Sequence, residues 1–335
     1  MTASRGIVMF AHNNDEIDYF RLAVVNAKLI QKNLGLGNDQ ITIVTDQHSK
    51  DHGIKTMGKR VVNSASKNIV VVEKDVKFKH SNKRLYKDTS QTGKHLSFYN
   101  INRCDVYEIS PYDETILIDA DYLIFSDALN RCWGHNNELM MNWQYQDIMH
   151  EREFHGLERL SSTGITMYWA TVVYFRKSSY CEYFFDLVKH VRQNQDYYRD
   201  LYKWPGNLYR NDYSFSIAAH TLGGFQDCVI PQLPVTLYKT FDTDDVHSFV
   251  PSKHGGLRLY LEKIRSPGDF VLCRWHDVDI HVMNKWAINR ISDSLFDFVS
   301  NKSKPHHKQS VGKKKRSKKQ PAKSTTTRQR RATAA

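Results

Sequence analysis

The sequence predicts an α/β fold with a mixed, mostly parallel central sheet flanked by helices. Two observations lead to this prediction. A strand, a helix and a second strand follow one another between residues 6 and 45, which is the order of a parallel β-α-β unit. Further along, residues 115–118 form a short apolar run rich in β-branched side chains, as expected for a strand buried on both faces.

The first β-α-β unit is clear in the hydrophobic pattern. Residues 6–11 read as a strand, and apolar residues then recur three and four apart from Ile17 to Leu34, as on one face of a helix. Gly35 ends this helix, and residues 40–45 form the second strand, closed by Asp46. The unit lacks the G-x-G-x-x-G fingerprint, which argues against a dinucleotide site.

The later elements follow from the same patterns. Residues 68–72 read as a third strand, 74–94 as a polar loop, and 93–103 as a helix. Beyond the apolar strand we expect the following elements: one or two strands in 163–175, helices over 180–191 and 210–220, strands over 232–241 and 269–276, and a closing helix over 288–298.

The strand at 115–118 stops at two carboxylates, Asp119 and Asp121, separated by one small residue. Ligands of open α/β sheets collect at the carboxyl ends of strands. Two carboxylates there are costly unless a cation neutralises them, and a divalent metal that carries a diphosphate would do so. The alternative is a turn whose aspartates are solvated or cap the next helix, as we expect for Asp127.

This arrangement resembles the metal site of GT-A glycosyltransferases, which have the nucleotide-diphospho-sugar transferase fold. The layout is nearest to the glycogenin-like branch (family 8-like) and covers residues 1 to about 298. The resemblance implies a metal-dependent enzyme with Mn²⁺ or Mg²⁺ as cofactor. Its donor would be a nucleotide-diphosphate sugar, a UDP-sugar first of all, and its acceptor an unidentified glycan, protein or DNA.

The resemblance also implies roles for residues late in the chain. It assigns the metal to Asp119, Asp121 and His281, and the diphosphate to Lys285. An imidazole with two carboxylates suits Mn²⁺. The proline expected after the lysine is absent, and His276 is a competing ligand.

Two carboxylates are the catalytic candidates. Asp212, near the start of a helix, would bring a carboxylate to the sugar beside Asp121. Its alternative role is to cap that helix. The second D-x-D, Asp242-Thr-Asp244, follows no continuous apolar strand and is expected to be a solvated loop.

The donor's nucleoside would meet the end of the first strand. The resemblance places Ala11, His12 and Asn13 there, with Asp46 near the base. In the resemblance, a basic residue near the helix expected over 93–103 contacts the donor, and Lys94 or Arg84 would be that residue. The alternatives are an ordinary turn between strand and helix, and a solvated lysine.

The formal charge of +12 belongs to the end of the chain. Residues 301–335 hold 13 of the 48 Lys and Arg residues and no Asp or Glu, which leaves 35 basic against 36 acidic residues before them. We therefore expect a GT-A domain over 1–300 and a disordered basic tail over 301–335. Residues 302–331 would attract a polyanion or nucleic acid, or remain solvated without a fixed partner.

Several features predict a cytoplasmic protein. No run of 18 apolar residues exists, so no membrane span is predicted, and the first residues lack the apolar region of a signal peptide. The five cysteines form no C-x-x-C pair and are odd in number, as expected in a reducing compartment.

Three other functions remain open at this point. A glycosyltransferase that modifies DNA would use the tail as a tether. A non-enzymatic nucleic-acid-binding protein would use the α/β body as a scaffold. A metal-dependent nucleotidyltransferase also uses paired aspartates, but it releases pyrophosphate and not a nucleoside diphosphate.

Overall fold

A computed structural model describes residues 3–73, 83–87, 93–149, 158–161, 164–204, 206–241, 244–251, 256–263 and 268–300. The basic tail predicted over 301–335 lies outside these residues, and so does Asp242. No helix in the described part is both long and apolar enough to cross a membrane.

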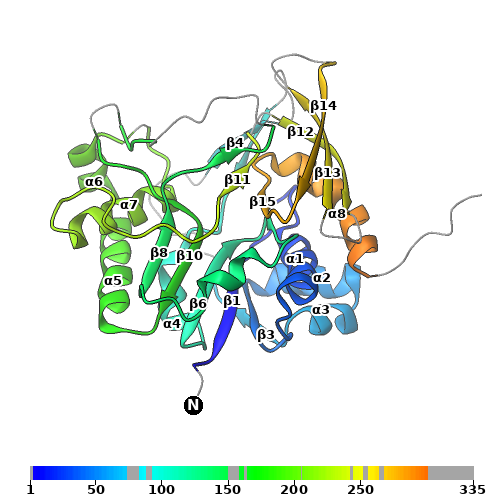
Figure 1. The fold of residues 1–335 in the computed structure, drawn as a ribbon, viewed down its shortest axis with the longest axis horizontal. Coiled ribbons are helices and arrows are strands. Elements are labelled where there is room, and N and C mark those ends of the chain that lie inside the picture. The colour runs from blue at the N-terminus through cyan, green and yellow to red at the C-terminus, as the bar shows by residue number, and fades with distance from the viewer. Residues whose placement is uncertain are drawn as a thin grey trace, which may run out of the picture.

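A six-stranded sheet forms the centre of the molecule (Figure 1), in the order β3-β2-β1-β6-β10-β8. Its strands are β3 Asn68–Val71, β2 Ile41–Thr45, β1 Arg5–Phe10, β6 Glu114–Asp119, β10 Trp169–Arg176 and β8 Leu139–Asn142. All run in one direction except β10, which is antiparallel to both of its neighbours. The predicted mixed, mostly parallel sheet is confirmed.

Helices cover both faces of this sheet. Ile7 and Met9 of β1 pack on one side, while Val8 and Phe10 pack on the other, because side chains alternate along a strand. The helices of the first side are α1 Tyr19–Leu34, α2 Gln47–Met57, α3 Lys59–Ala65 and α8 Lys285–Val299. Those of the second side include α4 Val106–Ile109, α5 Ser179–Gln193 and α7 Asn211–Leu222, with α6 Gln195–Tyr202 following α5.

The first helix is confirmed, and it begins two residues after the predicted Ile17. Asp18 is the N-cap of α1 and accepts a hydrogen bond from the Arg21 backbone N–H, so Tyr19 is the first helical residue. Gly35 ends it in the left-handed conformation, with φ of 72°, where glycine has no Cβ to clash.

Three smaller sheets surround one edge of the central sheet. The first contains β7 Tyr122–Leu123, β15 Ile280–His281, β11 Tyr238–Lys239 and β9 Gln146–Asp147. The second contains β12 Asp244–Pro251, β13 Gly256–Lys263 and β14 Phe270–His276. The third contains β4 Lys83–Lys87 and β5 Gly93–Ser97. Two 3₁₀ turns, η1 Asn102–Asp105 and η2 Ala128–Cys132, complete the described elements. The strand expected over 232–241 is only two residues long.

Three local predictions are wrong. The helix expected over 93–103 is strand β5 followed by η1, because β5 pairs with β4 and buries Leu96 against the core. The loop expected over 74–94 contains β4; its residues 74–82 and 88–92 lie outside the described part. Asp244 is not in a solvated loop, since it is buried at the start of β12 and accepts a hydrogen bond from the Phe241 backbone N–H.

Candidate functional site

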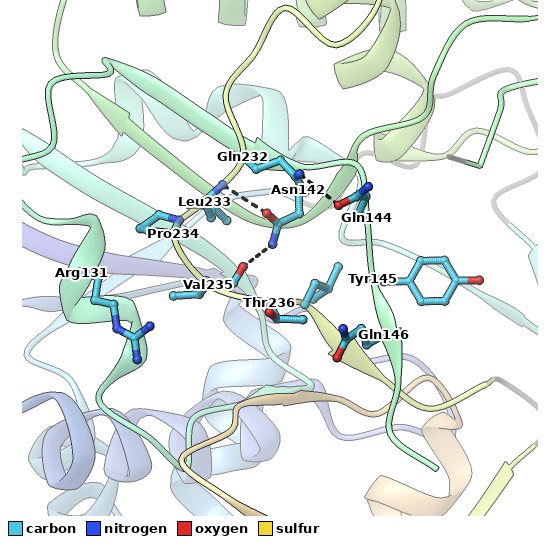
Figure 2. Close-up of a pocket in the computed structure, with 11 residues that line it drawn as sticks. Arg131, Asn142, Gln144, Tyr145, Gln146, Gln232, Leu233, Pro234, Val235 and Thr236 are labelled. Atoms are coloured by element: carbon cyan, nitrogen blue, oxygen red, sulfur yellow. Dashed lines mark hydrogen bonds between the residues drawn. The ribbon is translucent and has the colours of Figure 1, made fainter. Parts of the chain in front are cut away.

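Figure 2 shows a hollow of about 390 Å³, and none of the predicted metal residues lines it. Amide side chains line much of it, namely Asn142, Gln144, Gln146 and Gln232. The side chain of Asn142 already forms hydrogen bonds with the backbone: it accepts from the Leu233 N–H and donates to the Val235 carbonyl. Arg131 is the one charged residue among the described side chains that line this hollow, so their chemistry does not suit a metal ion.

The Asp-x-Asp pair lies where the sequence predicts, at the carboxyl end of β6. Asp119 is the last residue of this strand and pairs with Phe10 of β1. The chain then turns, and β7 begins at Tyr122. Asp121 is buried, whereas the side chain of Asp119 is 28% exposed. One carboxylate is therefore buried and the other is partly exposed, and both line the cavity described below.

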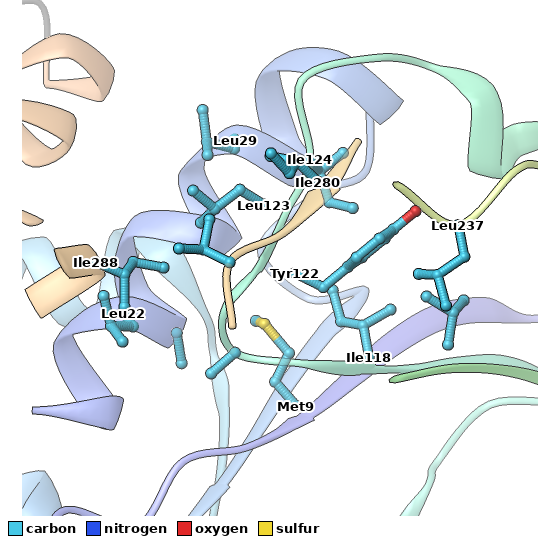
Figure 3. Packing of buried hydrophobic residues seen from close by; sticks show 14 of the residues in the cluster. Met9, Leu22, Leu29, Ile118, Tyr122, Leu123, Ile124, Leu237, Ile280 and Ile288 are labelled. Atoms are coloured by element: carbon cyan, nitrogen blue, oxygen red, sulfur yellow. The ribbon is translucent and has the colours of Figure 1, made fainter. Parts of the chain in front are cut away.

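Strand β15 brings His281 to these carboxylates from the far end of the chain. It runs antiparallel to β7 and pairs His281 with Tyr122, and Tyr122, Leu123 and Ile280 belong to one apolar cluster (Figure 3). His281 Nε2 lies 3.3 Å from Asp121 Oδ1 and 3.8 Å from Asp119 Oδ2. One ligand atom from each of these three residues lies within 4.8 Å of the others.

Thr171 orients the imidazole. Its Oγ1 lies 3.2 Å from His281 Nδ1, so an N–H on Nδ1 can donate to the hydroxyl while the lone pair on Nε2 faces the carboxylates. Metal-binding histidines use such a second partner to fix the tautomer and the ring orientation. The donor set of Asp119, Asp121 and His281 therefore suits a divalent ion such as Mn²⁺.

Two cations compensate the carboxylates. Arg103 Nη1 lies 2.6 Å from Asp119 Oδ1, and Lys285, the first residue of α8, pairs with Asp121. Burial raises the pKa of Asp119 more than Arg103 lowers it. Burial alone would also raise the pKa of Asp121, but Lys285 and His281 outweigh it and hold this pKa well below its ordinary value.

Asp212 faces the same cavity from the start of α7. It does not cap the helix, because the N-cap residue is Arg210 and no side chain caps this end. Instead Asp212 Oδ1 accepts from Ala170 N–H at 3.0 Å, and Oδ2 pairs with Arg210 Nη2 at 2.8 Å. Burial alone would raise the pKa of Asp212, but Arg210, the Ala170 N–H and Arg103 together outweigh it, and this pKa is lowered.

These side chains line one cavity of about 110 Å³. Its lining includes four cations and three carboxylates, an excess of one positive charge: Arg84, Arg103, Arg210 and Lys285 with Asp119, Asp121 and Asp212. Several buried polar atoms of the lining have no hydrogen-bond partner: Arg84 Nε, Arg103 Nε and Nη2, Trp169 Nε1 and Asn211 Oδ1. Because buried polar groups are normally paired, these atoms are the expected contacts of a polar, anionic ligand.

The residues predicted to meet the nucleoside lie at the ends of β1 and β2. Ala11 and His12 are buried, and Asn100 Oδ1 accepts the backbone N–H of His12 at 2.7 Å. Asp46 is the N-cap of α2, and its two oxygens accept the N–H and the hydroxyl of Ser49. These hydrogen bonds join parts of the protein to each other and hold the ends of the two strands in place.

Asn13 borders a separate hollow of about 410 Å³. Two histidines and a tyrosine share its lining with the residues that precede α1: His48, His52 and Tyr99 with Asn14, Asp15, Glu16, Ile17 and Asp18. The backbone N–H of Asn13 donates to the Ser49 hydroxyl. Its side chain donates to Asp18 Oδ1 and accepts from the Phe20 N–H, so it is fixed at the edge of this hollow.

Three other candidates do not line the metal cavity. Lys94 is exposed on β5 and pairs with Glu16. His276 is exposed at the end of β14, away from the three-residue cluster that contains His281. Asp127 is the N-cap of η2, although its side chain makes no capping hydrogen bond.

Sequence reasoning missed several residues of the cavity. Arg103 is buried in η1, a segment whose pattern predicts a helix. The pattern assigns Trp169 only to a strand, and Asn211 only to the start of a helix. The three successive polar residues Arg210, Asn211 and Asp212 were the one sequence feature that pointed to this part of the cavity. Polar residues also gather at helix starts as capping residues, so this feature alone does not indicate a binding site.

Comparisons with known proteins gave structural matches only. No protein-family model and no curated protein matches the chain. The galactosyltransferase LgtC, in complex with donor and acceptor sugar analogues, aligns with 64% of this chain and 69% of its own, at 15% identity and a TM-score of 0.37. Mouse xyloside xylosyltransferase 1 aligns over 64% and 82% of the two chains, at 10% identity and a TM-score of 0.37.

A third match is the apo form of the glycosyltransferase GlyE from Streptococcus pneumoniae. It aligns over 69% of this chain and 45% of its own, at 12% identity and a TM-score of 0.34. Similarity at this level assigns no activity to the chain. The function proposed below is therefore derived from the geometry and charge of the cavity.

Proposed function

We propose that this protein is a metal-dependent glycosyltransferase. It would move a sugar from a nucleotide-diphosphate sugar, with UDP-sugars the first donors to test, to an acceptor. The observation that carries the proposal is the cluster of Asp119, Asp121 and His281 at the end of β6, inside a cavity with an excess of positive charge. Carboxylates that hold a divalent ion beside additional cations suit a diphosphate.

The chain's own residues supply the binding of the metal and the leaving group. Asp119, Asp121 and His281 would hold Mn²⁺ or Mg²⁺, which acts as a Lewis acid on a leaving diphosphate when bound. Lys285 and Arg103 already contact the two carboxylates, so a diphosphate at the same place would meet two cations. Positive charge placed in advance stabilises the negative charge that develops on the leaving group.

Asp212 would stabilise positive charge, whereas the metal and the cations stabilise negative charge on the diphosphate. Its carboxylate is held from two sides by Arg210 and the Ala170 backbone N–H, and it stays ionised because its pKa is lowered. A fixed negative charge at the cavity wall would stabilise an oxocarbenium-like sugar or orient the acceptor hydroxyl. Asp212 is therefore the proposed catalytic carboxylate, with Asp121 as the buried anchor of the metal.

The proposed compartment is reducing. All five cysteines are free thiols, and four of them are buried. This state agrees with a cytoplasmic location, which we retain as part of the proposal. Contact of residues 302–331 with a polyanion also stays a prediction.

The released product tests the class of reaction. Purified protein with Mn²⁺ would be incubated with UDP-glucose, UDP-galactose or GDP-mannose, and the products separated by anion-exchange chromatography. A glycosyltransferase releases UDP or GDP, even when water is the acceptor in slow hydrolysis. In a parallel reaction with UTP or GTP and a sugar 1-phosphate, release of pyrophosphate and formation of a nucleotide sugar would instead identify a nucleotidyltransferase. Asp212→Asn serves as the control for a contaminating activity.

A further inference from the structure

The three-stranded sheet of β12, β13 and β14 has one face in the core and one face in solvent (Figure 1). Alternate residues of β13 and β14 point inward, namely Leu257, Leu259, Leu261 and Cys273, and these are buried. The residues between them are exposed: Arg258, Tyr260, Leu272, Arg274 and His276, with Phe270 at the start of β14. We call this second set the outer face.

Aromatic rings occupy one half of the outer face. Tyr260 and Phe270 stack in parallel, with ring centres 5.2 Å apart and planes 8° apart. They remain 41% and 44% exposed, and Leu272 beside them is 51% exposed. His247 of β12 adds a third ring, 5.4 Å from Phe270. Aromatic side chains are normally buried, so a parallel pair of exposed rings with a tilted third ring beside it suits a partner that has planar groups.

Two arginines occupy the other half of the outer face. Arg258 and Arg274 lie directly opposite each other in the register of β13 and β14. Like charges in this position destabilise a sheet. Within the residues that the structure describes, neither arginine has a carboxylate partner. An anion bound between them would remove the repulsion.

The acidic residues of the same sheet offset this charge only in part. Asp245 pairs with Arg290 of α8 at 2.6 Å, which balances its charge. Glu262 accepts from His247 Nε2 at 3.0 Å and from Gly268 N–H at 2.8 Å, but it keeps its negative charge. Arg258 and Arg274 therefore outnumber Glu262, and the outer face has an excess of one positive charge.

We propose that the outer face binds single-stranded nucleic acid, with bases on Tyr260 and Phe270 and phosphates on Arg258 and Arg274. Aromatic residues on an exposed sheet beside basic residues recognise unstacked bases and the backbone that joins them. A duplex keeps its bases stacked inside and cannot place them on the rings. The outer face does not share residues with the metal cavity, so this proposal is independent of the proposed enzymatic activity.

Binding of a labelled oligothymidylate of about 12 nucleotides to the full chain tests the proposal, by fluorescence anisotropy over a range of salt concentrations. Tyr260→Leu with Phe270→Leu keeps the apolar surface but removes the rings, and should weaken binding roughly fivefold or more. Arg258→Gln with Arg274→Gln should weaken binding and reduce the slope of log affinity against log salt by about 1.4, or about 0.7 for each phosphate that is no longer neutralised.

Controls separate the outer face from other basic parts of the chain. Lys59→Gln with Arg60→Gln removes the same charge from exposed positions of α3 and should leave the affinity unchanged. An abasic strand of equal length should bind more weakly than oligothymidylate and should not respond to the ring substitutions. Ultraviolet crosslinks to the thymines should map to β13 and β14.

Two results would overturn the proposal. One is wild-type affinity in both double variants, with crosslinks only in residues 301–335. The other is equal affinity for the abasic strand and oligothymidylate, which would make this face a general polyanion surface. Thermal unfolding and circular dichroism of each variant would confirm that the fold is intact, as expected for exposed substitutions.

Discussion

Two regions at the same edge of the central sheet differ in how their polar groups are satisfied. At the ends of β1 and β2, Asp46 caps α2 through Ser49, and His12 is held by Asn100. At the end of β6, carboxylates meet cations around a cavity, and several buried polar atoms of its lining have no partner. A polar residue that follows a strand can therefore stabilise the fold or bind a ligand. The hydrogen bonds and ion pairs that it makes within the protein show which of these roles it has.

The largest effect should come from Asp212, which belongs to the cavity at the end of β6. Asp212→Asn should lower kcat by roughly 100-fold or more, because a preorganised charge at the reacting centre is lost. The affinity for UDP and Mn²⁺ should stay the same, since Asp212 is not in the metal cluster. Steady-state kinetics with a UDP-sugar would measure kcat and KM separately, and an unchanged kcat would remove Asp212 from the reaction.

The same carboxylate should give a pH-dependent contribution to stability. Its pKa in the folded protein lies below the ordinary 3.8, so the stabilisation is fully present above about pH 4 and is lost as the pH falls through the folded value. The difference in unfolding free energy between wild type and Asp212→Asn should therefore shrink below pH 4. Urea unfolding at pH 7 and pH 3 would show it, and an equal difference at both pH values would contradict it.

Arg103 should have the next largest effect, on the donor and not on the metal. Arg103→Met removes a charge-assisted interaction and should weaken UDP binding by roughly 10- to 100-fold. Mn²⁺ binding should be equal or tighter, because Arg103 no longer competes for Asp119. Arg131→Met, in the separate hollow of Figure 2, is the matched control. Parallel loss of UDP binding in both variants would indicate a general charge effect.

Thr171 should have a smaller effect, through the orientation of His281. Thr171→Val removes the hydroxyl that lies 3.2 Å from His281 Nδ1, and Mn²⁺ affinity should fall about tenfold. Paramagnetic resonance of free Mn²⁺ during a titration would measure this affinity. Wild-type affinity in the variant would show that β7 and β15 alone position the imidazole.

The smallest effect on function should come from the region whose groups are satisfied. Asp46→Ala should reduce the free energy of unfolding by about 1 kcal/mol, because α2 loses its N-cap. UDP affinity should not change. Denaturant unfolding and calorimetry would measure the two quantities, and a loss of UDP affinity without a loss of stability would instead place Asp46 at the nucleoside.

The site could be predicted from the sequence only where it depends on a local pattern of residues. An apolar run that ends in Asp119-Ala-Asp121 is a local pattern, so the buried strand and the carboxylates at its end were predictable. The approach of Arg103 to Asp119 depends on a buried 3₁₀ turn, which no local pattern shows. Asp212 had the pattern of a helix cap, and only the position of Ala170 in β10 reveals its other partner.

The missed strands have the same cause. Residues 93–97 form β5 because β4 pairs with them, and β12 and β13 form because β14 completes their sheet. Each of these strands pairs with the next one along the chain, and the hydrophobic pattern of one segment alone shows neither that pairing nor its register. The outer face could not be predicted for this reason, since Arg258 and Arg274 become neighbours only through the register of β13 and β14.

Calorimetric titration of UDP, and then GDP, with and without Mn²⁺ tests the central claim most directly. Wild type, Asp121→Ala and Asp127→Ala would be compared, because Asp127 is an exposed carboxylate outside the metal cluster. We predict metal-dependent binding of one diphosphate by wild type and by Asp127→Ala, and its loss in Asp121→Ala. Absence of binding to either diphosphate by the folded wild-type protein with Mn²⁺ would contradict the proposed donor site.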